Sequence, residues 1–336
     1  MSTTATPLRY AIDDRHAGVR VDAALADLVP GLSRRQAMRA IASGWVTVDG
    51  RPVAKAYRLN VGAILELARS PLVDLTDGLI AGAALPALTD RALVLVHADL
   101  LIVDKPAAMA CQPLRPDETG TLVQWVATRF PEVVDAGPDR REGGLLHRID
   151  VDTSGVVALA RNRRTFDLLR PAFADGRVHK RYLAVAIDDP QLAVADALPL
   201  GEGGAIELPL GRSRAAAGLM VALVRGDEKI RGEPLPASTR YRVLARGDRC
   251  ALIEVEIGRG RMHQIRAHLA AIGHPLLGDA RYGGADPALP RQALHAAELR
   301  LELDGVELVG RASLPADLVA LCEARKIPSS WERSLS

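Results

Sequence analysis

The segment LLHRIDVDTSGVVALAR, residues 145–161, places an ionisable side chain, Asp150, between two apolar runs. A buried carboxylate without a partner is costly, so Asp150 must lie at a break between buried elements and have a partner or a chemical task. The following residues 152–155, Asp-Thr-Ser-Gly, have the composition of a turn that side-chain hydrogen bonds and a glycine hold in place. We therefore expect Asp150 on a rigid support at the edge of a cleft, as a catalytic group requires. The local pattern fits equally well a carboxylate that only caps the turn.

Length and composition place the chain among globular proteins with more than one domain. It has 336 residues, of which 48% are hydrophobic and 25% charged. No apolar stretch approaches the roughly 20 residues that span a bilayer, and residues 1–18 lack the apolar centre of a secretory signal. The three cysteines, Cys111, Cys250 and Cys322, are scattered, which argues against a disulfide framework or a zinc ribbon. We expect a cytoplasmic protein with no membrane contact, in which each cysteine is a small buried residue.

The amino-terminal residues 1–70 form a small basic segment. They carry ten Lys/Arg and six Asp/Glu, a balance of +4, against +2 for the whole chain. The pattern predicts helices over 21–31 and 34–43, the second with Met38, Ile41 and Ala42 on its apolar side, followed by a hairpin at Asp49-Gly50. Arg35 and Arg39 share another side at the i, i+4 spacing. By themselves these arginines fit a solvated helix face or a polyanion-binding surface.

The remainder of the chain interleaves short strands and helices. Residues 68–92 lose periodicity and concentrate Pro, Gly, Asp and Thr, so we expect a linker over 71–92 between a domain of residues 1–70 and one of residues 93–325. The later segments lack the strict βαβ order of a parallel sheet. They predict an α+β fold with a mixed, largely antiparallel sheet and flanking helices. One of these helices is expected to start at Met262 and to bury Met262, Ile265, Leu269 and Ile272.

Three histidines in that region raise the question of a metal site. His263, His268 and His274 are spaced by five and six residues, whereas a helical zinc site uses an i, i+4 pair. No acidic cluster accompanies them. We expect no metal.

Residues 20–67 resemble the RNA-binding domain named after ribosomal protein S4. The resemblance lies in the Ser-Arg-Arg start of the second helix, the glycine before the strand, and the Val-Thr-Val-Asp-Gly hairpin. It implies that Arg34, Arg35 and Arg39 face the RNA backbone.

Residues 94 to about 303 resemble the large pseudouridine synthase family that modifies ribosomal and transfer RNA. HRIDVDTSG, residues 147–155, is similar to the family signature H-R-L-D-x-x-T-S-G. IVDKPAAM precedes it, and HKRYLAVA, the long motif IEVEIGRGRMHQIRAHLAAIGHPLLGDARYGG and LHAAEL follow in the family order. The resemblance implies an enzyme that detaches uracil from its ribose within RNA, rotates it and rejoins it through a ring carbon, without a cofactor.

The resemblance also implies roles for individual residues. Asp150 matches the catalytic aspartate, which either attacks the anomeric carbon or removes the neighbouring proton. Arg266 matches the arginine that pairs with it, Tyr182 the tyrosine that stacks on the extruded uracil, and Arg148 the residue that fills the gap left by the uridine. The resemblance thus implies that Asp150, Tyr182 and Arg266 are catalytic and that Arg148 contacts RNA.

The chain departs from the family at four places around this site. Ala108 stands where glycine is usual, Cys111-Gln112 where a histidine is common, Val151 where lysine is frequent, and Ala267 where a β-branched residue is frequent. These changes bear on RNA contacts and hence on the target.

We expect a monomeric RNA pseudouridine synthase, with large-subunit ribosomal RNA favoured over transfer RNA as the substrate. The competing interpretation is a non-catalytic RNA-binding or ribosome-assembly factor on the same fold. The intact set of Asp150, Tyr182 and Arg266 argues against it. A hydrolase is excluded because no nucleophile–base pair occurs in a recognisable order.

Overall fold

The computed structural model describes residues 7–29, 32, 34–42, 44–68, 88–115, 118–189, 199–226 and 228–330, with backbone alone for residues 35, 36 and 39. The chain divides into two compact units, one of residues 1–86 and 112–144 and one of residues 87–111 and 145–336. The predicted linker, residues 71–92, lies outside the described residues except for its last five, which include the short helix η1 (Asp90–Ala92).

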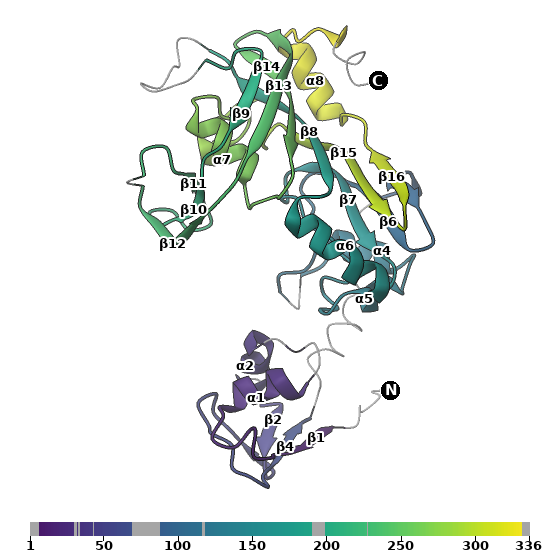
Figure 1. Ribbon diagram of the computed structural model, residues 1–336, viewed down its shortest axis with the longest axis vertical. Helices are drawn as coiled ribbons and strands as arrows, with labels where there is room; N and C mark the ends of the chain where they lie inside the picture. Colours follow the sequence, from purple (N-terminus) through teal and green to yellow (C-terminus); the bar gives the residue numbers. More distant parts are fainter. Residues whose placement is uncertain are drawn as a thin grey trace. The chain divides into compact units, whose positions relative to one another are not determined.

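The amino-terminal part of the first unit is a small α+β fold (Figure 1), as predicted. Its four-stranded antiparallel sheet has the order β1-β4-β2-β3. The hairpin between β2 and β3 turns at Asp49 and Gly50, whose φ angles of 50° and 74° are those that a two-residue turn between twisted strands requires. The elements are β1 (Leu8–Ala11), α1 (Val21–Leu28), α2 (Arg34–Ala42), β2 (Val46–Val48), β3 (Arg51–Pro52) and β4 (Ile64–Leu67).

The apolar side of α2 is rotated from the predicted one. Ala37, Ala40 and Ile41 are buried, whereas Met38 is 37% exposed and Ala42 is exposed. The prediction was wrong because it favoured the large Met38 over two alanines. The i, i+3, i+4 spacing of residues 37, 40 and 41 is the set that packs against α1.

The same unit contains α4 (Leu122–Ala127) and α5 (Val133–Ala136). α4 begins at Thr121, whose side chain accepts a hydrogen bond from the backbone of Gln124 while the Gln124 side chain accepts one from the backbone of Thr121. This reciprocal cap satisfies two of the amide groups that a helix start leaves without partners.

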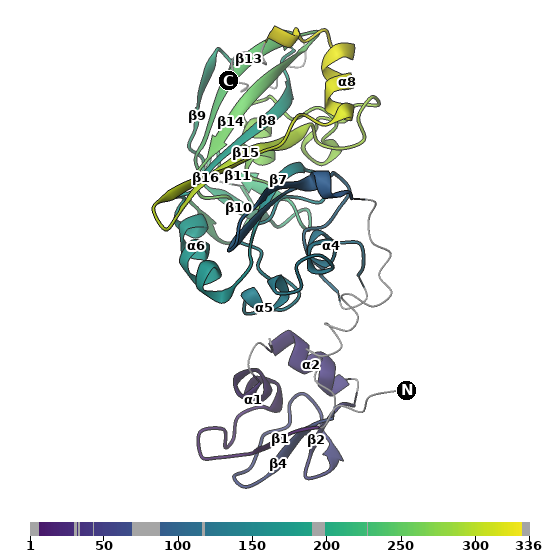
Figure 2. The same ribbon diagram turned by 90° about the vertical axis from the view of Figure 1, so that its right-hand side faces the viewer.

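The second unit is built on a nine-stranded sheet with the order β5-β6-β7-β15-β8-β14-β13-β9 and β16 paired to β15 (Figure 2). All neighbouring strands are antiparallel except β7 and β15. The predicted mixed, largely antiparallel sheet is confirmed. Its strands are β5 (Leu93–Val96), β6 (Leu100–Lys105), β7 (Ser154–Ala160), β8 (His179–Ile187), β9 (Gly203–Ile206), β13 (Thr239–Gly247), β14 (Cys250–Ile257), β15 (Leu294–Leu303) and β16 (Val306–Arg311).

Helices and a second, smaller sheet complete this unit. α6 (Arg163–Asp175) ends at Gly176, whose φ of 79° is the left-handed conformation that suits glycine at a helix end. The sequence did not predict the three-stranded sheet of β10 (Leu210–Ser213), β11 (Met220–Ala222) and β12 (Ile230–Leu235). The remaining elements are α7 (Gln264–Ala271), η3 (Ala280–Tyr282) and α8 (Ala316–Ala324).

The start of α7 corrects a prediction. His263 has a φ of 52°, in the left-handed region, so the helix begins at Gln264 and Met262 lies outside it, 43% exposed. The other three residues of the predicted stripe, Ile265, Leu269 and Ile272, are buried.

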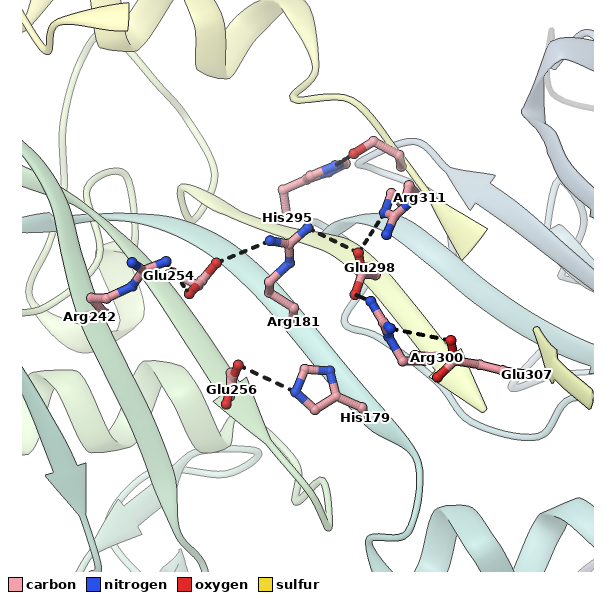
Figure 3. Close-up of polar contacts among 11 residues, drawn as sticks. His179, Arg181, Arg242, Glu254, Glu256, His295, Glu298, Arg300, Glu307 and Arg311 are labelled. Carbon is pink, nitrogen blue, oxygen red and sulfur yellow. Dashed lines mark hydrogen bonds and ion pairs between the residues drawn. The ribbon is translucent and has the colours of Figure 1, made fainter. Parts of the chain in front are cut away.

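An ion-pair network crosses one face of the large sheet (Figure 3). Arg181 on β8 donates to Glu254 on β14 and to Glu298 on β15, and Glu298 also accepts hydrogen bonds from Arg300 and Arg311. Both Glu254 and Glu298 are buried, so these charges need the partners that they have. Because side chains alternate along a strand, the network on Arg181 leaves the next residue, Tyr182, on the opposite face.

Candidate active site

A rigid turn carries Asp150 to the start of β7. The backbone N–H of Thr153 donates to the carbonyl oxygen of Asp150 at 3.1 Å, and the Thr153 hydroxyl accepts a hydrogen bond from Gln292. Gly155 ends the turn with a φ of 113°, and a Cβ there would lie 2.2 Å from the carbonyl oxygen of Ala296. The glycine of the motif is therefore required where β7 and β15 approach each other. The turn holds the Asp150 side chain in place, with 27% of it exposed.

Arg266 reaches Asp150 from α7. Its Nη1 donates to Oδ2 of Asp150 at 2.9 Å, and its side chain is only 6% exposed. The structure thus brings together two residues that are 116 positions apart in the chain. The contact is a charge-assisted hydrogen bond, which fixes the direction of the Asp150 carboxylate.

Asp279 holds the other side of the same guanidinium. It accepts hydrogen bonds from Nε of Arg266 at 2.6 Å and from Nη2 at 2.9 Å, and its side chain is 1% exposed. Burial opposes the charge on Arg266, but the hydrogen bonds and charges of Asp279 and Asp150 outweigh it and raise the pKa of Arg266. The sequence analysis did not single out Asp279. The signal that was available is its place within the long motif of residues 253–284, directly after Gly278.

Tyr182 lies on β8, opposite Val255 of β14 and Ala296 of β15. It is 6% exposed. Burial, and then the negative charge of Asp150, raise the pKa of Tyr182, so its hydroxyl stays protonated at any physiological pH. β15 joins Tyr182 to the Asp150 turn, because Ala296 is paired with Tyr182 on one side and with Gly155 on the other.

His263 and Tyr282 complete the surroundings of Asp150. The Tyr282 hydroxyl accepts a hydrogen bond from the backbone N–H of Met220 and is hydrogen-bonded to Nδ1 of His263, each at 3.0 Å. Nε2 of His263 then faces Oδ2 of Asp150 at 3.9 Å. Burial is the main cause of a lowered pKa for His263, which keeps its ring neutral near pH 7. The Tyr282 ring lies under the guanidinium of Arg266, 5.0 Å from its centroid.

Lys105 anchors the loop that packs beside the Asp150 turn. Its side chain is fully buried at the end of β6, and Nζ donates to the carbonyl oxygens of Pro106, Met109 and Val151 at 2.8, 2.8 and 2.9 Å. Burial lowers the pKa of Lys105 to about 8. The Val151 contact joins this loop to the residue next to Asp150. Ala108, within the loop, has a φ of 60°, the conformation for which glycine is suited.

Of the four arginines predicted to contact RNA, the structure describes two side chains, those of Arg34 and Arg148. Arg148 is exposed next to the Asp150 turn. Arg34 donates from Nε to Oδ2 of the buried Asp22 at 3.1 Å, and Arg20 binds the same carboxylate, so Arg34 has a structural partner that the sequence did not suggest. The side chains of Arg35 and Arg39 lie outside the described part of the chain.

In the described ranges of the chain no group of three His, Cys, Asp or Glu side chains could hold a metal ion, and no helix is long and apolar enough to cross a bilayer. Cys111, Cys250 and Cys322 are all buried and free of disulfides, as predicted.

Comparison with known proteins gives a consistent result for both parts of the chain. The family described as RNA pseudouridylate synthase matches residues 99–271, which contain the contact between Asp150 and Arg266. The chain belongs to this family. The S4 domain matches residues 19–65.

The relatives and the solved structures agree with this membership. The ribosomal large subunit pseudouridine synthase D of Nitrosomonas europaea is 31% identical over 96% of this chain and 89% of its own length. An uncharacterised RNA pseudouridine synthase of Chloroflexus aurantiacus is 34% identical over 89% of this chain and 87% of its own. The solved structure of human RNA pseudouridylate synthase domain containing 1 has 26% identity and a TM-score of 0.51, covering 70% of this chain and 94% of that protein.

This RNA pseudouridine synthase therefore combines the family's catalytic fold with an S4 domain. Its five predicted motifs converge in the structure: the Asp150 turn, the Lys105 loop, the Tyr182 strand, the Arg266 helix and β15 all meet around one carboxylate.

Proposed function

We propose that this pseudouridine synthase acts on uridines of large-subunit ribosomal RNA, with Asp150 as the catalytic carboxylate. The observation that carries the proposal is the contact of Asp150 with the buried guanidinium of Arg266. A carboxylate that is paired with a fixed, buried cation, yet 27% exposed, can reach the sugar of an extruded nucleotide. The ribosomal target is supported by the relative from Nitrosomonas europaea, which is named a ribosomal large subunit pseudouridine synthase.

In this proposal the other predicted residues serve the extruded uridine. Tyr182 stacks on the uracil ring, a contact worth on the order of 1–3 kcal/mol per base. Arg148, exposed beside the Asp150 turn, occupies the space that the uridine leaves in the RNA. Extrusion costs a few kcal/mol, so one group that holds the base and one that fills its place both favour it.

The amino-terminal domain supplies affinity for structured RNA. We assign residues 1–70 to this domain, 71–92 to a linker and 93–325 to the catalytic domain. Arg35 and Arg39, with Arg34 at the start of α2, contact phosphates, which gives affinity rather than sequence information. Arg34 does so while it also holds Asp22, because its side chain remains 58% exposed. The enzyme is a cytoplasmic monomer in this proposal.

Mapping pseudouridines in total RNA, with and without the gene, tests the proposed target. We expect specific sites in large-subunit ribosomal RNA to be lost on deletion and restored by the parent chain but not by Asp150→Asn. Loss confined to transfer RNA would contradict the ribosomal target. Restoration by Asp150→Asn would contradict the catalytic role of Asp150 and favour a non-catalytic assembly factor.

A further inference from the structure

The three-stranded sheet of β10, β11 and β12 is attached to the helix that carries Arg266 (Figure 1). Leu210, Met220 and Ala222 on one face of this sheet pack against Ala267 of α7. The backbone N–H of Met220 also donates to the Tyr282 hydroxyl, and the Tyr282 ring contacts Arg266. A continuous set of contacts therefore fixes this small sheet beside the active site.

Two arginines lie directly opposite each other on that sheet. Arg212 of β10 is paired with Arg231 of β12 across one strand boundary and with Met220 of β11 across the other. Residues that are directly opposite share a face, so the side chains of Arg212 and Arg231 leave the sheet on the side of Met220, next to a register irregularity between Leu210 and Arg212. Both side chains are exposed. Within the described ranges, no carboxylate forms an ion pair with either of them.

A pair of like charges at this position is unfavourable for the protein alone. Opposed like charges on neighbouring strands destabilise a sheet by a few tenths of a kcal/mol or more. The nearby Glu228 does not relieve the pair, because its carboxylate accepts hydrogen bonds from the backbone N–H groups of Val224, Arg225 and Gly226. An anion between the two guanidinium groups would remove the repulsion.

We propose that Arg212 and Arg231 bind a phosphodiester of the RNA strand that flanks the target uridine. Two guanidinium groups on Cβ atoms about 5 Å apart can each donate to the same phosphate, which is the anion that this planar fork fits best. The pair is connected to the active site, because Met220, beside Arg212, is linked through Tyr282 to Arg266. The anion that reaches this position is therefore a phosphate of the substrate RNA. The inference rests on the proposed function, since it assumes an RNA strand at Asp150.

Binding to an RNA transcript of the large subunit, measured in the inactive Asp150→Asn chain over a series of salt concentrations, tests this pair. Arg212→Gln with Arg231→Gln should weaken binding about tenfold near 0.1 M salt and lower the log–log salt slope by about one, the effect of one lost phosphate contact. The matched control is Arg163→Gln with Arg164→Gln, which removes two exposed arginines of α6 that pair with Asp167 and Asp304. An equal loss of slope in both double variants would overturn a local phosphate site.

Two further readouts separate this role from a structural one. Relief of the repulsion should leave the melting temperature of the Arg212→Gln, Arg231→Gln chain unchanged or raise it, while its RNA affinity falls. Arg212→Lys with Arg231→Lys keeps both charges and should keep the salt slope. If the lysine variant loses as much slope as the glutamine variant, the pair does not bind phosphate.

Kinetics of the active chain distinguish failure of the phosphate site from failure of the proposed function. In the active chain, the glutamine double variant should raise the KM for RNA about tenfold and leave kcat within about twofold of the parent, because a phosphate contact binds substrate and transition state alike. If the parent chain leaves ribosomal RNA unmodified but its binding depends on Arg212 and Arg231, the proposed target fails and the phosphate site stands. If the parent is active and the double variant binds and turns over as the parent does, the phosphate site fails.

Discussion

Asp279 accepts two hydrogen bonds from Arg266, on Nε and Nη2, and leaves Nη1 to donate to Asp150. The fork of the guanidinium is planar and rigid, so a carboxylate that binds two of its nitrogens also fixes the direction of the third. Asp279 is a positioning residue in this arrangement, because its buried carboxylate acts on Asp150 only through Arg266.

Asp279→Asn should lower the rate of uridine isomerisation about 100-fold and reduce stability by about 3 kcal/mol. The amide keeps the shape of the side chain but lacks the second acceptor and the charge, so Arg266 can rotate away from Asp150. Single-turnover tritium release from uracil-labelled RNA gives the rate, and urea unfolding gives the stability. A variant with parental kcat would show that Arg266 needs no support from Asp279.

Arg266→Lys should be almost as harmful as Arg266→Ala. An ammonium cannot donate to Asp279 and Asp150 in two fixed directions, so we expect kcat to fall about 100-fold for lysine and about 1000-fold or more for alanine. RNA affinity in the same variants, measured by filter binding, should change by less than threefold. If the lysine variant retains kcat, the charge of Arg266 matters and its geometry does not.

The sequence predicted the parts of this site that are local in the chain. The Asp150 turn and, elsewhere in the chain, the β2–β3 turn at Asp49-Gly50 were readable from their turn residues. The partnership of Arg266 with Asp279 was not, because it depends on the irregular segment after α7 returning to the helix. The β10–β12 sheet was missed because its strands are short and its only buried apolar side chains come from β10 and β11.

Tyr182→Phe tests the stacking role separately from the hydroxyl. Removing the hydroxyl leaves the ring in its buried position on β8, so RNA affinity should stay within about twofold of the parent, whatever happens to later proton transfers. Tyr182→Ala, which removes the ring, should weaken binding by about tenfold or more. Weaker binding by a folded Tyr182→Phe chain would contradict stacking.

Ala108→Gly should stabilise the chain by about 0.5–1 kcal/mol. Ala108 holds a φ of 60° in the loop fixed by Lys105, and a left-handed residue with a Cβ costs about 1–2 kcal/mol. The greater freedom of glycine in the unfolded chain offsets part of that gain.

Gly155→Ala is the opposite case, because its Cβ would lie 2.2 Å from the Ala296 carbonyl oxygen. We expect it to unfold the second unit or to lower its stability by several kcal/mol. Thermal melting of both variants checks the two signs, and a destabilised Ala108→Gly chain would show that this loop is unstrained.

Three histidines should titrate at widely separated pH values. Hydrogen bonds to Asp13 and Asp27 raise the pKa of His16 above 6.5. Burial, and then the charges of Lys180 and Arg170, lower the pKa of His147 to about 3, and burial lowers that of His295 to about 4. In NMR spectra of ring-labelled protein we expect His16 to titrate above pH 6.5 and the other two to stay neutral down to pH 5. His16→Gln identifies its signal.

These shifts also fix the direction in which stability depends on pH. The charged His16 stabilises the fold below its unfolded pKa near 6.5, and that contribution is lost as the pH rises through its raised pKa. The half-buried His147 and the buried His295, both neutral, act in the opposite direction. The unfolded chain takes up their protons as the pH falls below 6.5, so the second unit should lose on the order of 1–2 kcal/mol per histidine between pH 6.5 and 5. Urea unfolding at these two pH values, in the parent and in His147→Gln, measures the loss. An equal acid sensitivity of the parent and His147→Gln would show that His147 does not carry it.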